Sequence, residues 1–190
     1  MQRILRPRRR AFWGIPVVFV ALGLFSCVNY PRAAAPHNAE KRIQELGISL
    51  PEVPKPVATY VPTVRVGNLL FTSGHGPKKP DGSHVQGKVG KDLTLEQGKE
   101  AARLTAISVL ASVRSELGSL DKVVRLVKVL GMVNATADFK QQSQVINGFS
   151  DLMVEVFGKE AGTAARSAVG MGSLPIGIAV EIEAVFEVRD

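Results

Sequence analysis

The feature that most constrains the fold is a change of hydrophobic period along residues 60–188. Apolar side chains alternate loosely in 60–66 and continue in a second short run at 69–72. They recur every three or four residues in 94–117, alternate in 122–133, and then change once more from helical to strand spacing. A period of two is typical of strands and a period of 3.6 of helices. The order strand, strand, helix, strand, helix, strand, strand predicts an α+β domain with two helices on one face of a mixed β-sheet.

Turn and strand signals locate the first three strands. Gly67-Asn68 separates a loosely alternating run from a second strand-like run and is typical of a two-residue hairpin turn. In the run 122–133, strict alternation places Val123, Arg125 and Val127 on one side. We therefore expect a hairpin followed, after one helix, by a long third strand.

Capping signals locate the helices. Thr94 followed by Gln97 matches a capping box, and Gly118 is placed to end that helix. A second helix is expected to begin after Asp138 as its N-cap and to end at Gly158. Two helices of this length cover one face of the sheet, so we expect another subunit to cover the opposite face.

Charge and cysteine separate a leader from the body of the chain. Residues 1–36 hold six of the 24 Lys and Arg residues and none of the 17 acidic ones, so the other 154 residues carry 18 basic and 17 acidic side chains. A body so close to neutral does not favour nucleic-acid binding. The only cysteine, Cys27, lies in the leader, which excludes a disulfide, a thiolate nucleophile or a Cys-ligated metal from the body.

The leader, residues 1–36, has the layout of a secretory signal. A basic start precedes an apolar run from Ala11 to Val28, and Leu24 to Cys27 resembles a bacterial lipobox with Cys27 as the lipidated residue. We expect an exported protein that is lipid-anchored or periplasmic, with membrane contact only through this leader. Cleavage after the small residues that follow, an uncleaved anchor and an organelle transit peptide remain as alternatives.

Residues 37–58 are expected to form a Pro-rich tether between the leader and a domain at 59–190. Within the tether, Ile43 and Leu46 form one apolar edge and Gly47 is placed to stop a short helix.

Three charges stand in the nearly apolar stretch 165–184. Its strands are expected at 165–171 and 177–188, and a hairpin turn at 173–174 would place Arg166 opposite Glu181, with Glu183 on the same face as Glu181. Buried charges need partners or water. An ion pair at a subunit interface and a wet cleft both satisfy this need.

Two motifs resemble a known family. "VGNLLFTSGHGP" (66–77) and "ARSAVGMGSLPIGIAVEIEA" (165–184) resemble the RidA/YjgF family of imine and enamine deaminases, some members of which carry labels such as translation inhibitor or endoribonuclease. The resemblance covers about 130 residues. It implies a chorismate-mutase-like homotrimer with ligand clefts between subunits.

The same resemblance implies roles for five residues. Arg166 would bind the substrate carboxylate, for which a guanidinium fork is suited, and Glu181 would activate water or move a proton. Tyr60, Ser73 and Asn147 fall at polar cleft positions that bind substrate or water. From the residues alone, a strand aromatic, a turn hydroxyl and a solvated amide remain as alternatives for these three.

The histidines have no metal-site spacing. His75 replaces the glutamine that is usual in the family and would lie near the cleft, where it is a candidate substrate-binding and proton-transfer group. His37 and His84 are expected in solvent. We expect no metal and no cofactor. Ala168 stands where the family often has cysteine, and the segment before Asn147 is longer, which indicates a divergent subgroup.

The sequence therefore favours a hydrolase of small 2-imino or 2-enamino acids that releases a 2-oxo acid and ammonia. A trimer that binds small carboxylates without turnover is an alternative. A ribonuclease or translation inhibitor is a further one, against which the neutral body counts.

Overall fold

The computed structural model describes residues 38–53 and 59–190, all within one compact unit. The leader with Cys27, and His37, lie outside the described residues. The expected order of strands and helices is confirmed, and a short helix precedes it. The elements are α1 (Ala39–Glu45), β1 (Thr63–Val66), β2 (Leu69–Thr72), α2 (Leu95–Leu117), β3 (Val123–Asn134), α3 (Gln142–Gly162), β4 (Ala165–Met171) and β5 (Val180–Val188).

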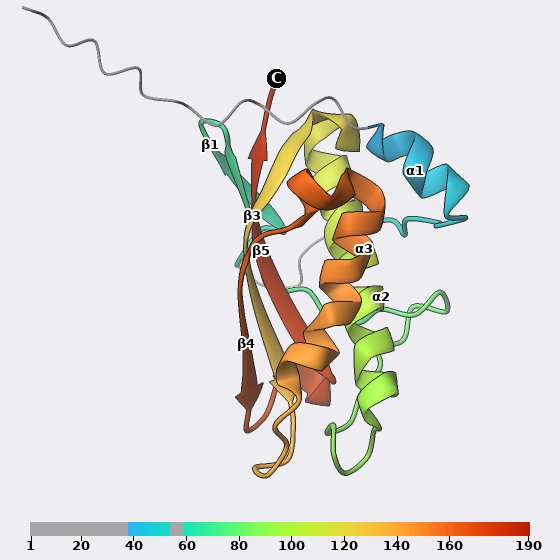
Figure 1. Ribbon diagram of the computed structural model, residues 1–190, viewed down its shortest axis with the longest axis vertical. Coiled ribbons are helices and arrows are strands. Elements are labelled where there is room, and N and C mark those ends of the chain that lie inside the picture. Colours follow the sequence, from blue (N-terminus) through green and yellow to red (C-terminus); the bar gives the residue numbers. More distant parts are fainter. Residues whose placement is uncertain (1–37, 54–58) are drawn as a thin grey trace, which may run out of the picture. The chain divides into compact units, whose positions relative to one another are not determined.

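The sheet has the strand order β1-β2-β5-β3-β4. Neighbouring strands are antiparallel except β3 and β4, which are parallel and joined through α3. A parallel pair needs such a crossover, because the chain must return to the same end of the sheet. Figure 1 shows α2 and α3 side by side on one side of the sheet. This is the expected α+β arrangement.

The expected hairpin between the last two strands is wrong. β3 lies between β4 and β5: Val129 pairs with Arg166 on one side, and Met132 pairs with Glu181 on the other. The break at 172–175 has the glycine and proline of a tight turn, but the chain there crosses the end of β3 through a short 3₁₀ turn at Pro175–Gly177. Arg166 and Glu181 are therefore not cross-strand partners.

Several local signals are confirmed. Thr94 and Gln97 form the capping box of α2, and Gly118 ends that helix with a φ of 80°. Gly67, with a φ of 60°, lies in the turn between β1 and β2. A positive φ is strained for a residue with a Cβ, which explains a glycine at both places.

The second helix starts later and ends later than expected. Asp138 is not its N-cap, because a main-chain turn from Thr136 to Phe139 comes first and α3 begins at Gln142. Gly158 interrupts the helix with a φ of 78°, and one further turn follows it. The glycine therefore marks a kink, not the helix end.

Two irregularities also alter the expected alternation of β3. The pairing with β5 shifts register between Val123 and Arg125 and again between Leu126 and Lys128. Each shift inserts an extra residue that changes which side chains face the helices. Val123, Leu126 and Val129 are consequently the buried side chains in this half of the strand.

The short helix α1 is docked on the domain. Ala39 and Ile43 are buried, and Glu40 accepts a hydrogen bond from the main-chain N–H of Leu120 at 2.9 Å. None of the helices in the described ranges is long and apolar enough to cross a bilayer.

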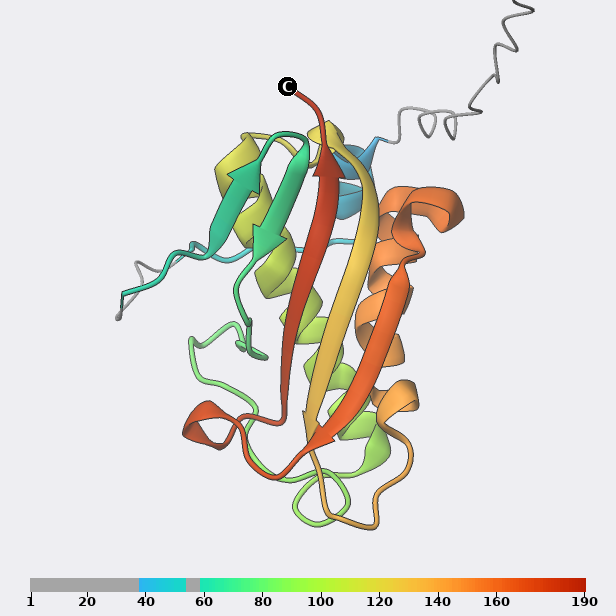
Figure 2. The same ribbon diagram turned by 90° about the vertical axis from the view of Figure 1, so that its left-hand side faces the viewer.

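The sheet face away from the helices carries exposed apolar side chains. Figure 2 shows this face turned toward the viewer, with no helix in front of the strands. Its exposed large apolar residues come from β1 to β4 and are Val64, Val66, Phe71, Val127 and Val169. An exposed apolar face of this extent is typical of an interaction surface.

Candidate functional site

A cavity of about 770 Å³ lies where β2 ends beside the start of β5. One face of α2, the segment after β2 and the turn before β5 also line it. Four of the site residues expected from the sequence border this cavity, namely Tyr60, Ser73, His75 and Glu181.

Glu181 is a partly buried carboxylate of β5 without an ion-pair partner among the described residues. Its carboxylate lies against Gly74, where any added Cβ would overlap Oε1. Partial burial, and then the nearby charge of Glu183, raise the pKa of Glu181. Such a carboxylate exchanges protons at a higher pH than a free glutamate does.

His75 is fixed in the cavity by its main chain and by its ring. The main-chain N–H and C=O of His75 pair with Ile182 at 2.9 and 3.0 Å. The ring Nδ1 lies 2.7 Å from the carbonyl oxygen of Ser73, and Nε2 lies 2.8 Å from the Ser112 hydroxyl. Burial lowers the pKa of His75, although the Ser73 carbonyl opposes this shift.

The other cavity residues differ in their exposure. Tyr60 is 53% exposed at the rim, and the Ser73 hydroxyl donates to the Val61 carbonyl at 2.5 Å, a bond to local main chain. His84, which we expected in solvent, is half-buried and lines the cavity. Ser112 was not predicted, because a serine on the inner face of a helix has no distinguishing pattern.

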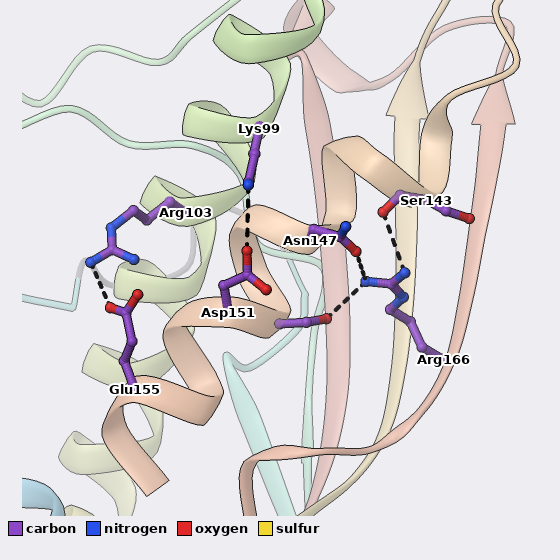
Figure 3. A network of polar contacts seen from close by, with 8 residues as sticks. Lys99, Arg103, Ser143, Asn147, Asp151, Glu155 and Arg166 are labelled. Atoms are coloured by element: carbon purple, nitrogen blue, oxygen red, sulfur yellow. Dashed lines mark hydrogen bonds and ion pairs between the residues drawn. The ribbon is translucent and has the colours of Figure 1, made fainter. Parts of the chain in front are cut away.

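Arg166 and Asn147 form a second cluster, on β4 and α3 (Figure 3). Arg166 Nη1 donates to Asn147 Oδ1 at 2.9 Å and to Ser150 Oγ at 3.0 Å, and Nη2 donates to the Ser143 carbonyl at 3.3 Å. All three acceptors are neutral, and no ion pair to Arg166 forms among the described residues. The positive charge is positioned but not neutralised.

The hydrogen bonds of Arg166 leave part of its guanidinium free. A guanidinium has five N–H groups. The three bonds to α3 use both N–H groups of Nη1 and one of Nη2. The Nε–H and one Nη2–H have no partner among the described residues, and two such groups are what a carboxylate needs for a bidentate pair.

Arg166 and Glu181 lie on opposite faces of the sheet within one chain. Side chains of paired residues share a face, and those three apart on a regular strand face opposite ways. Arg166 pairs with buried Val129 and faces the helices, whereas Glu181 pairs with Met132 on the other face. The structure therefore brings Glu181 together with His75, and Arg166 with Asn147, but not the two groups with each other.

No group of three metal-ligating side chains occurs in the parts of the chain that the structure describes.

Comparison with known families matches residues 40–182 to the family described as "YjgF/chorismate mutase-like, putative endoribonuclease". The chain belongs to this family. Protein TCP17 of Trypanosoma cruzi is 43% identical over 148 residues, which are 78% of this chain and 92% of that protein. The match begins within α1, which agrees with the docked position of this helix.

Two solved structures share the fold and part of the sequence. The protein Atu1372 of Agrobacterium tumefaciens has a TM-score of 0.71 at 41% identity, covering 79% of this chain and 91% of its own. A protein of Shewanella oneidensis, described as a putative endoribonuclease, has a TM-score of 0.75 at 29% identity, covering 79% of this chain and 99% of its own. The resemblance to the RidA/YjgF family and the chorismate-mutase-like fold are confirmed.

Proposed function

We propose that this protein hydrolyses small 2-imino and 2-enamino acids to 2-oxo acids and ammonia. The observation that carries the proposal is the state of Arg166: three neutral acceptors hold its guanidinium, and two of its N–H groups have no partner among the described residues. That arrangement suits a monocarboxylate ligand, since the ligand supplies the missing negative charge.

We further propose that the site forms between subunits of a homotrimer. Arg166 and Glu181 face opposite sides of one sheet, so a small substrate needs Arg166 from one subunit and Glu181 from its neighbour. The exposed apolar face of β1 to β4 supports such an assembly, because its burial is the usual source of association energy. A head-to-tail contact that closes after three copies gives three equivalent sites.

Hydrolysis of an imine requires few catalytic groups from the protein. With the carboxylate fixed by Arg166, the adjacent C=N carbon is held beside the Glu181 cavity. The imine nitrogen takes a proton, water attacks the carbon, and the resulting carbinolamine loses ammonia to leave the 2-oxo acid. Orientation of the reactants, together with a proton-exchanging carboxylate, supplies the acceleration.

The description of relatives as putative endoribonucleases supplies the alternative activity. The residues after the leader are almost neutral in net charge, which gives little attraction for phosphates. A trimer that binds carboxylates without turnover would use the same arginine. Ammonia release from freshly generated 2-aminoacrylate distinguishes the deaminase from both alternatives, since only the deaminase accelerates it.

A subunit-mixing experiment tests the shared site. Arg166→Ala and Glu181→Gln chains, each inactive alone, are unfolded together at equal amounts and refolded. Random mixed trimers regain intact sites wherever Arg166 of one chain meets Glu181 of the other, about one quarter of the wild-type number. No recovery from correctly assembled mixed trimers would refute the site between subunits, and no acceleration by the wild-type chain would refute the activity.

A further inference from the structure

A histidine and a serine that both line the cavity are in contact with each other. His75 Nε2 lies 2.8 Å from the hydroxyl of Ser112, which belongs to α2 and is only 4% exposed. Both residues line the cavity. Ser112 is therefore a residue that a ligand or a water molecule in the cavity can approach.

The hydrogen bonds determine where the protons lie. A carbonyl oxygen only accepts, so the 2.7 Å contact to the Ser73 carbonyl requires the hydrogen on Nδ1. Nε2 of the neutral ring is then an acceptor, and the Ser112 hydroxyl donates to it. Because its hydrogen is committed to His75, Ser112 presents lone pairs to the cavity.

We propose that Ser112 and His75 form a proton relay that takes a proton from the attacking water and returns it to the departing nitrogen. The relay rests on the proposed deaminase activity and gives that site its base. Ser112 is the group that touches the reactants, and His75 acts through it as a positioning and proton-storing residue.

Protons are conserved in the two steps of the reaction, the attack of water and the loss of ammonia. As the water oxygen bonds to the carbon of the protonated imine, one water proton passes to Ser112 Oγ and the Ser112 proton passes to His75 Nε2. The charged His75 then donates through Nε2, and the Ser112 hydroxyl hydrogen turns toward the cavity. In the second step this hydrogen goes to the amine nitrogen while His75 returns its Nε2 proton to Ser112 Oγ, the C–N bond breaks, and the carbinolamine hydroxyl proton leaves to water as the C=O bond forms.

The surroundings of the pair suit this role. Ser112 and its neighbours on α2 that line the cavity carry no charge. The titratable and charged groups that face the same cavity from the other elements are Glu181 of β5, Glu52, Tyr60, Lys78 and His84. Burial lowers the pKa of His75, which keeps its ring neutral and ready to accept a proton at physiological pH.

Replacement by glutamine separates a relay from a structural hydrogen bond. The amide of His75→Gln can donate to the Ser73 carbonyl and accept from Ser112, so both contacts survive, but an amide does not titrate. Ser112→Ala removes the hydroxyl that touches the reactants. Thr105→Val is the matched control, because the buried Thr105 hydroxyl bonds to the Ala101 carbonyl of the same helix and has no other partner in the part of the chain that the structure describes.

The experiment measures kcat and KM for ammonia release from 2-aminoacrylate against pH, using the full chain. We expect His75→Gln and Ser112→Ala each to lower kcat about 10- to 100-fold with KM nearly unchanged. The part of the acid-side fall in kcat that reports protonation of His75 should disappear in His75→Gln and persist in Thr105→Val.

The two proposals fail in different ways. A wild-type chain that releases no ammonia above the uncatalysed rate overturns the proposed function and the relay with it. If the wild type is active and His75→Gln keeps both the kcat and the pH dependence of kcat of the wild type, the relay alone is overturned.

Discussion

Replacing Arg166 by lysine keeps the charge of the proposed carboxylate site but removes its fork. A lysine ammonium can retain one bond to the carboxylate, whereas the free Nε–H and Nη2–H of Arg166 allow two. A hydrogen bond to a charged group is worth about 1.5–3 kcal/mol. Since 1.4 kcal/mol is a factor of ten, we expect kcat/KM to fall about 10- to 100-fold. The loss should appear mainly in KM, because the carboxylate does not react.

Steady-state ammonia release with 2-aminoacrylate measures this change. Arg103→Lys is the matched control: Arg103 donates to Glu155 at 2.9 Å on the outer surface of the helices, as Figure 3 shows. A partly exposed pair of this kind contributes about 0–1 kcal/mol, so the control should keep wild-type kinetics. Wild-type KM and kcat in Arg166→Lys would refute the carboxylate-binding role of Arg166.

Four further changes test the packing and the titrations. Gly148→Ala should lower the free energy of unfolding by about 1–3 kcal/mol or more in urea denaturation, because its Cβ would overlap the Lys99 carbonyl of α2. Gly74→Ala should displace the Glu181 carboxylate and reduce kcat while the circular dichroism spectrum stays native. Glu181→Gln should raise Tm at pH 7 but not below pH 4, because the raised pKa means that the folded state disfavours the ionised carboxylate. The pKa of His75 is lowered in the folded state, so the unfolded chain binds more protons than the folded chain below about pH 6.5. The stability of the wild type should therefore rise with pH up to about 6.5, and His75→Gln should flatten that rise.

The elements that local signals define were predictable from the sequence. The capping box at Thr94, the glycine at 118 and the Gly67-Asn68 turn depend on neighbouring residues only, and each is where the sequence placed it. The N-cap of α3 was not predictable, because Asp138 is a good capping residue and only the main-chain turn from Thr136 to Phe139 moves the helix start.

Strand pairing was the main error, and it has a physical cause. A glycine- and proline-containing break between two apolar runs looks the same whether the chain makes a hairpin or crosses the end of a third strand. The parallel pairing of β3 with β4 depends on α3 packing against the sheet, where Gly131 lets Ile146 approach closely. Such long-range packing leaves no signature in the segment 165–184 itself.

The corrected pairing changes the interpretation of the charges in that segment. A direct ion pair between Arg166 and Glu181 would have neutralised both groups and left nothing for a ligand. With β3 between them, two N–H groups of Arg166 and the carboxylate of Glu181, whose pKa is raised, have no partner in the ranges 38–53 and 59–190. Each is costly to maintain in a folded chain that gains nothing from it. Two unpaired opposite charges on opposite faces are explained together if neighbouring copies bring them to one substrate, and the mixing of Arg166→Ala with Glu181→Gln chains tests that explanation directly.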